Sequence, residues 1–395
     1  MYFSPDVFYW SGLLAYLGYL STRRSLTTKE MIRLVFVNTK FTVNEKPPKL
    51  IEVYKRDHYV EYEYLLPFGL CLNEKVTEAL TQIFTKPVRI YTEHSKLFIR
   101  AYNEDLPTEV NHDSFPKRGG WQVPLGLTLE GPVYHNFEKR PHMIVAGMTR
   151  YGKSILLKSV LTSLIETNPD NLRVYIIDMK GGLEFGRFDH LRQVVKVGAD
   201  TSEAKEIFEE VHAEIEKMMK WMRQKRITNV VKSGVKQRTF IIIDEGAQLA
   251  PAPFMDKEEK KAMQYCQYVM SEITRVAGAL GYRLIYGSQY PTADNLPRQV
   301  KQNADGGVSF RLPTKTASLV AIDDTGSEEL TIPGRAIYKT STREEIQTPL
   351  IEDDNMLSRL DKYKRKEPKG EGNNGNVNEV GTTPDTKRSD LVQFG

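Results

Sequence analysis

Between about residue 126 and residue 350, short runs of apolar residues alternate with longer segments whose apolar residues recur at helical spacing. Short apolar runs predict buried strands. The clearest runs are residues 143–146 (MIVA), 172–178 (LRVYIID), 239–244 (TFIIID), 282–289 (YRLIYGSQ) and 306–313 (GGVSFRLP). Between them, residues 203–225 and 262–281 carry apolar side chains at helical spacing. Strands that alternate with helices predict an α/β fold, in which helices flank a parallel sheet.

Two further segments adjoin this region. Residues 25–125 combine strand-like alternation with a helical stretch at 74–84, which predicts a small α+β domain that precedes the α/β domain. The α/β domain itself is expected to cover residues 126–355. Residues 356–395 are rich in Lys, Gly and Asn and poor in apolar residues, so they are predicted to form a disordered tail.

Residues 1–24 are apolar and aromatic and end in Arg23 and Arg24. The run 7–20 is short for a bilayer span, but a segment counted from Met1 is long enough and would leave the arginines on the cytoplasmic side. Two interpretations stay open. The segment either attaches the protein to the inner face of the cell membrane, or forms a helix that is buried or binds a partner.

Composition narrows the class of protein only slightly. The chain has 395 residues, is 40% hydrophobic and 27% charged, and carries a formal net charge of +4. These values are typical of a globular protein and are compatible with a polyanionic partner without identifying one. Cys71 and Cys266 are far apart, which argues against a disulfide framework or a zinc site and favours a reducing compartment such as the cytoplasm.

The strand at 143–146 leads into a recognisable phosphate-binding motif. Gly147, Gly152, Lys153 and Ser154 match the pattern G-x-x-x-x-G-K-[ST]. In such a loop the glycines let the backbone wrap a phosphate chain, and the N–H groups point inward at the oxygens. Lys153 is expected to reach the β- and γ-phosphates of ATP, and the Ser154 hydroxyl to bind Mg²⁺. The expected nucleotide-binding residues are Gly147, Met148, Thr149, Arg150, Tyr151, Gly152, Lys153, Ser154 and Ile155.

Two acids and an amide complete the candidate site. Asp244 and Glu245 follow a buried strand 91 positions after Lys153. Asp244 is expected to bind Mg²⁺, and Glu245 to act as the general base that orients the attacking water. Gln289 ends the next strand and is expected to contact the γ-phosphate or that water, although a plain turn before Pro291 is the alternative.

These motifs resemble the FtsK/SpoIIIE DNA translocases over roughly residues 120–340. Residues 124–154 resemble that family's approach to its phosphate loop, and residues 333–338 (PGRAIY) its closing segment. Asp178 and Lys180 match its Ile-Asp-x-Lys motif. The resemblance implies a RecA-like ATPase, usually a hexameric ring around DNA with ATP between subunits, to which an arginine of the neighbouring subunit contributes. That arginine cannot be placed by position here, so Arg275 and Arg311 are the candidates.

The ends of the chain separate it from the chromosomal members. It has no room for a multi-span membrane region or a C-terminal winged helix, and so looks more like the short coupling ATPases of Gram-positive conjugative plasmids and integrative elements. This resemblance implies DNA as the substrate, with a relaxase and a membrane transfer channel as partners. Arg298, Lys301 and Lys315 are candidate contacts to DNA phosphates.

Two other functions compete with DNA translocation. Relatives of this fold drive type VII protein secretion, but they usually contain several ATPase modules, whereas one is visible here. A nucleotide-switched adaptor without catalysis is the third hypothesis. It is disfavoured because Lys153, Asp244 and Glu245 are all present.

Overall fold

The computed structural model describes residues 26–365, and these fall into two compact units that divide between Asp105 and Leu106. The sequence predicted a boundary at residues 125 and 126. The structure differs because Trp121, Val123 and Leu125 are buried in the core of the larger unit. The segment that looked like a connecting loop therefore contributes packing to the α/β domain.

The smaller unit is the expected α+β domain. Its described part has a four-stranded antiparallel sheet in the order β1 (Lys49–Lys55), β2 (Tyr59–Leu65), β4 (Lys96–Tyr102) and β3 (Val88–Glu93). Helices α2 (Thr28–Asn38) and α3 (Glu74–Gln82) bury Phe36 and Leu80 in the same cluster as Leu97 and Ile99 of β4. Thr27 and Glu30 start α2 with a capping box, which satisfies backbone N–H groups at the helix end.

The larger unit is built on one mixed sheet that has ten strands within the described residues. In order across the sheet they are β10 (Val194–Gly198), β9 (Leu172–Asp178), β11 (Arg238–Asp244), β12 (Tyr282–Ser288), β8 (Met143–Ala146), β13 (Gly306–Ser309), β14 (Arg335–Lys339), β15 (Arg343–Gln347), β6 (Gln122–Thr128) and β7 (Gly131–Asn136). The strands from β10 to β13 are parallel, as expected. The strands from β14 to β7 extend the sheet in antiparallel fashion.

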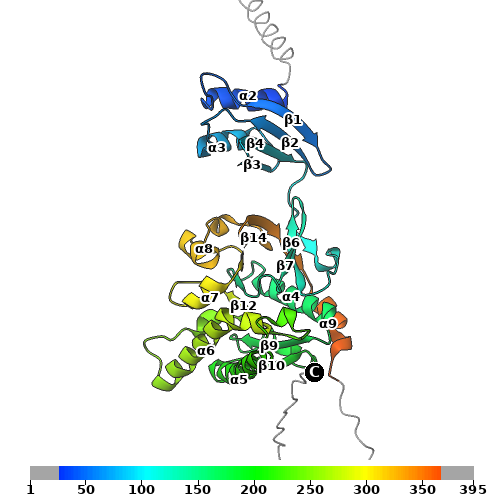
Figure 1. Ribbon diagram of the computed structural model, residues 1–395, viewed down its shortest axis with the longest axis vertical. Coiled ribbons are helices and arrows are strands. Elements are labelled where there is room, and N and C mark those ends of the chain that lie inside the picture. Colours follow the sequence, from blue (N-terminus) through cyan, green and yellow to red (C-terminus); the bar gives the residue numbers. More distant parts are fainter. Residues whose placement is uncertain (1–25, 366–395) are drawn as a thin grey trace, which may run out of the picture. The chain divides into compact units, whose positions relative to one another are not determined.

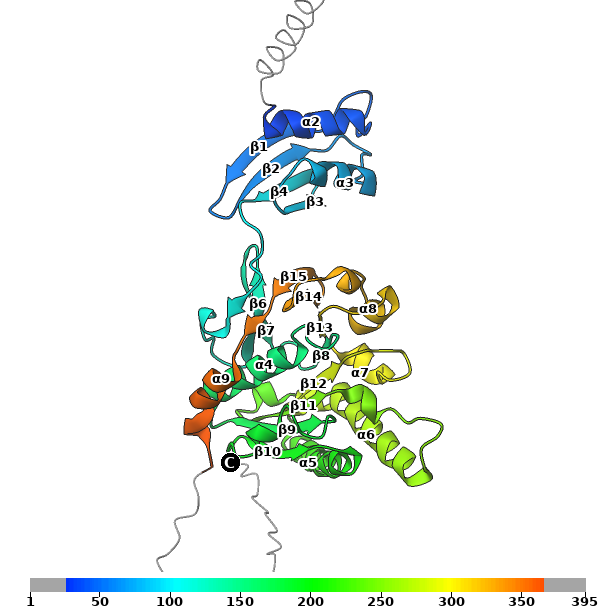
Figure 2. The ribbon, with the colours of Figure 1, turned by 180° about the vertical axis from the view of Figure 1, so that it is seen from behind.

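Helices cover both faces of this sheet (Figures 1 and 2). α4 (Lys153–Thr167) and α9 (Asp353–Leu360) pack on one face, whereas α5 (Thr201–Lys225) and α6 (Lys257–Arg275) pack on the other. Two shorter helices, α7 (Arg298–Asn303) and α8 (Lys315–Ile322), connect the later strands. The observed architecture therefore agrees with the predicted α/β class.

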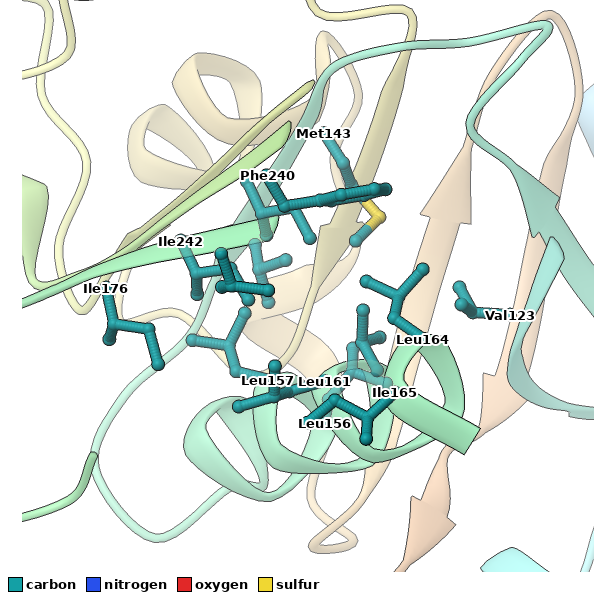
Figure 3. Packing of buried hydrophobic residues seen from close by; sticks show 14 of the residues in the cluster. Val123, Met143, Leu156, Leu157, Leu161, Leu164, Ile165, Ile176, Phe240 and Ile242 are labelled. Carbon is teal, nitrogen blue, oxygen red and sulfur yellow. The ribbon is translucent and has the colours of Figure 1, made fainter. Parts of the chain in front are cut away.

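Strand alternation explains how the apolar runs serve both faces. Successive side chains of a strand point to opposite sides of the sheet. In β11, Phe240 and Ile242 pack in the cluster that contains the α4 leucines, whereas Ile241 and Ile243 pack with α5 and α6. Figure 3 shows the first of these clusters, with Leu161 of α4 among its labelled residues. A strand buried on both faces must be apolar throughout, as the sequence is.

The C-terminal part of the described chain is ordered where the sequence predicted a tail from residue 356. α9 inserts Met356 and Leu360 into the core beside α4. A short parallel pair, β5 (Val110–Asn111) and β16 (Pro349–Leu350), lies just before it. The packing was hidden because two buried side chains in one short helix give a weak periodic signal. The rest of the expected tail, residues 366–395, lies outside the described residues.

The expected N-terminal membrane segment, residues 1–24, also lies outside the described residues. Within residues 26–365, no helix has both the length and the apolar character that crossing a bilayer requires.

Replacing Met356 tests whether α9 belongs to the core. Because Met356 is fully buried, Met356→Ala should lower the free energy of unfolding by about 2–4 kcal/mol. Ser358→Ala, at an exposed position of the same helix, should change it by less than about 0.5 kcal/mol. Urea denaturation followed by tryptophan fluorescence measures both, since Trp121 is in the same core. Equal stability of the two variants would contradict the packing of α9.

Candidate phosphate-binding site

The phosphate loop joins β8 to α4 at the carboxyl edge of the parallel strands. Gly152 adopts φ = 114°, a conformation that favours glycine, and it directly precedes α4. A Cβ at Gly147 would lie 2.6 Å from Cβ of Phe310, and one at Gly152 would lie 3.0 Å from the Phe310 ring. Both motif glycines are therefore required by the close approach of Phe310.

Hydrogen bonds to neighbouring segments fix the path of the loop. Gly147 N–H donates to the Ser288 carbonyl at 3.1 Å, and Met148 N–H donates to the Arg311 carbonyl at 2.9 Å. These two amides build the loop and are not free to hold a phosphate. The first intrahelical bond of α4 runs from Leu156 N–H to the Gly152 carbonyl at 2.9 Å. The amides of Lys153, Ser154 and Ile155 therefore form the open N-terminus of the helix, which attracts anions.

The acids lie opposite the loop lysine. β11 ends at Asp244, which is fully buried, and Glu245 follows with 7% exposure. Lys153, itself 4% exposed, forms an ion pair with Oδ1 of Asp244, and its Nζ lies 3.6 Å from Oε2 of Glu245. The expected pairing of loop and strand-end acids is thus present, although Lys153 faces carboxylates rather than a phosphate.

The carboxylates fit a divalent cation. Among the described residues, Asp244 Oδ2 and Glu245 Oε2 are buried oxygens without a hydrogen bond. Buried carboxylate oxygens with spare acceptor capacity are the donors that Mg²⁺ prefers. Ser154, on the first turn of α4, is the hydroxyl that the motif offers to the same ion.

Gln289 connects the acids with the phosphate loop. Its N–H donates to Oε1 of Glu245 at 3.1 Å, and its side-chain oxygen accepts from the Thr149 hydroxyl at 3.3 Å. It follows β12, which pairs with both β8 and β11. Gln289 therefore lies between the acids and the phosphate loop, and its contact with the γ-phosphate or the attacking water stays a prediction.

The two candidate arginines lie in different places. The Arg311 carbonyl anchors the phosphate loop, and its guanidinium donates to the Leu330 carbonyl at 2.9 Å, so Arg311 lies beside its own site. Arg275 ends α6, ahead of the start of β12, and is paired with Glu272 at 2.5 Å. Since the parallel strands carry the phosphate loop at their carboxyl ends, Arg275 lies at the opposite edge. Arg275 is therefore remote from the phosphate loop of its own chain, whereas Arg311 lies beside it.

The candidate DNA contacts differ in how exposed they are and in whether they are already paired. Lys301 is paired with Asp323 at 3.0 Å, and burial lowers its pKa, so it is poorly placed to grip a backbone phosphate. Arg298, the first residue of α7, and Lys315, the first residue of α8, are both exposed.

Sequence reasoning assigned no role to two residues that shape the site. Phe310 follows β13 and supports the loop, but an apolar residue at a strand end carries no sequence signal for that contact. Lys180 follows β9, and its Nζ lies 3.6 Å from Asp244 Oδ2. Its signal was available, because it belongs to the Ile-Asp-x-Lys motif, yet the motif did not indicate what the lysine contacts.

Comparison with known proteins agrees with this geometry. Residues 113–277 match the model of the FtsK/SpoIIIE family. The DNA translocase FtsK of Staphylococcus epidermidis is 26% identical over 266 residues, and the match covers 62% of this chain and 32% of that protein. The DNA translocase FtsK of Campylobacter jejuni is 27% identical over 228 residues, and the match covers 55% of this chain and 23% of that protein. The chain thus spans about a third or less of the length of these relatives.

Two solved structures share the fold. The pCW3 conjugation coupling protein TcpA, in a monomer form with ATPγS, matches with a TM-score of 0.62 at 22% identity, covering 85% of this chain and 99% of TcpA. The cytoplasmic domain of the Thermomonospora curvata type VII secretion ATPase EccC matches with a TM-score of 0.54 at 20% identity. This match covers 67% of this chain and 34% of the EccC chain. The fold and the loop define the larger unit as a P-loop ATPase domain. Within that class, the chain is similar to the FtsK/SpoIIIE family over residues 113–277.

The contact between Gly152 and Phe310 predicts a stability effect. Gly152→Ala forces an alanine into a left-handed conformation and against the Phe310 ring, so it should lower stability by about 1–3 kcal/mol. Gly186→Ala is the matched control, because its φ is ordinary and a Cβ there meets no atom within 4 Å. Thermal melting should show a drop of several degrees for the first variant and almost none for the second. An unchanged melting temperature for Gly152→Ala would refute the loop geometry.

Proposed function

We propose that this chain is an ATPase that uses ATP hydrolysis to translocate DNA. The observation that carries the proposal is the convergence of Lys153, Asp244, Glu245 and Gln289 on one phosphate loop. Each motif alone occurs in unrelated proteins, whereas together they supply a phosphate cradle, a metal-binding acid and a base for water. The FtsK relatives over the same region favour DNA as the substrate.

The residues of the site divide the work of hydrolysis. The amides at the start of α4 would hold the phosphates, and Lys153 would leave Asp244 to contact the β- and γ-oxygens. Asp244 and Ser154 would then hold Mg²⁺, which neutralises the charge that develops on the transferred phosphoryl group. Glu245 would orient the attacking water, and Gln289, hydrogen-bonded to Glu245 and Thr149, would position it against the γ-phosphate.

Oligomerisation would complete the site. Arg275 cannot reach its own phosphate loop from the opposite edge of the sheet, but it could reach the nucleotide of an adjacent copy in a ring. We therefore assign the trans arginine to Arg275, and to Arg311 a role at its own loop. A hexamer around DNA, with exposed Arg298 and Lys315 contacting backbone phosphates, is the assembly that this arrangement favours.

The biological setting is proposed from the fold match to a conjugation coupling protein. In that setting the protein would act in the cytoplasm at the inner face of the membrane and deliver DNA from a relaxase to a transfer channel. A type VII-like secretion ATPase is the alternative function, because EccC shares the fold.

ATP turnover with and without DNA tests the proposal. The wild type should hydrolyse ATP and be stimulated by duplex or single-stranded DNA. Lys153→Ala and Glu245→Gln should each reduce the rate by about a hundredfold or more, since the first removes phosphate contacts and the second the base. Glu245→Gln should still bind ATP.

Lys205→Ala, at an ion pair on the surface of α5, is the control and should retain full activity. Full activity of Lys153→Ala would refute the site. Stimulation by a secreted peptide, with no response to either form of DNA, would replace DNA translocation by the secretion function.

A further inference from the structure

Lys180 lies close to a carboxylate of the candidate site, but the mechanism above gives it no role. It lies two residues beyond β9, whose last residue, Asp178, pairs in register with Asp244 on β11. Met179 N–H donates to the Asp244 carbonyl at 3.3 Å, so the chain leaves β9 directly beside the end of β11. The Lys180 side chain is 28% exposed and extends its Nζ to 3.6 Å from Asp244 Oδ2.

Asp178 fixes the loop that presents Lys180. Its buried carboxylate accepts N–H groups from Lys180 at 3.2 Å, from Glu184 at 2.9 Å and from Phe185 at 3.0 Å. A buried carboxylate that ties three amides of one loop leaves that backbone little freedom. Lys180 is therefore held near Asp244 by construction of the loop, and Asp178 acts on the backbone rather than on a ligand.

The charges of the cluster balance only when Lys180 is counted. Asp244 and Glu245 are opposed by Lys153 and Lys180. When Lys153 moves to a phosphate, the two acids face the incoming polyanion. At the short distances within this cluster, with little solvent between the charges, one unit charge changes the affinity for the nucleotide by about tenfold or more. Lys180 is the cation that stays with the acids at that moment.

We propose that Lys180 is a positioning residue that keeps Asp244 neutralised while Lys153 transfers from Asp244 to the phosphates of the nucleotide. This inference rests on the proposed nucleotide-binding function. Its consequence is specific: Lys180 matters most when no divalent cation is present, because Mg²⁺ bound at Asp244 supplies the same positive charge.

Equilibrium binding of a fluorescent ATP analogue to the full-length chain, measured in EDTA and in saturating Mg²⁺, tests the inference. Lys180→Gln should bind the analogue at least about tenfold more weakly than the wild type in EDTA, and within about threefold of it in Mg²⁺. Lys180→Arg keeps the charge and should bind like the wild type under both conditions. Lys196→Gln, which removes a partly exposed lysine of β10 paired with Glu206, is the matched control and should have no effect.

The outcomes are distinct. Equal affinity of Lys180→Gln and the wild type in EDTA would overturn the role of Lys180 alone. A loss of the same size in EDTA and in Mg²⁺ would also overturn it, because a disturbed loop would weaken both complexes equally. Failure of the wild type to bind the analogue under either condition would instead overturn the proposed function, and this inference with it. Melting temperatures of all variants within a few degrees of the wild type verify that each is folded.

Discussion

The burial of two adjacent carboxylates at the end of one strand is the constraint on which the site depends. Asp244 is fully buried and Glu245 nearly so. Ionised carboxylates cannot lie in such a place without cations or strong donors, because their desolvation costs several kcal/mol each. Lys153 and Lys180 provide that compensation. The same arrangement makes the site responsive to nucleotide and metal. A polyanion competes with the acids for Lys153, and a divalent cation competes with Lys153 for the acids.

The register of the parallel strands creates this meeting of charges. Asp178 lies opposite Asp244, and Ala146, at the end of β8, lies opposite both Ser288 and Ser309. Because the strands end together, the loops that follow them share one edge of the sheet, which is where ligands of open α/β sheets bind. The glycines and Phe310 then set how closely the phosphate loop can approach. The strands that carry this edge are packed on both faces of the sheet, by α4 on one side and by α5 and α6 on the other.

Much of this arrangement could be predicted from the sequence because its signals are local. The phosphate loop is a contiguous motif, and Asp244, Glu245 and Gln289 each follow an apolar run whose end is visible in the sequence. The parallel sheet follows from the alternation of strands and helices. Contacts between distant segments could not be found in this way. Examples are the contact of Phe310 with the loop, the burial of Met356 in the core and the hydrogen bond from Gly147 N–H to the Ser288 carbonyl.

The arginines illustrate the same limit. Arg275 and Arg311 were equivalent as sequence candidates. Only the strand directions show that Arg275 lies at the opposite edge of the sheet and Arg311 lies at the loop. A structure with bound Mg²⁺ and a non-hydrolysable ATP analogue is the measurement that tests the central claim most directly. The account predicts that Lys153 Nζ contacts the β- and γ-phosphate oxygens and no longer pairs with Asp244, which instead faces the metal. A nucleotide bound elsewhere, or at the loop with the Lys153–Asp244 pair intact, would contradict it.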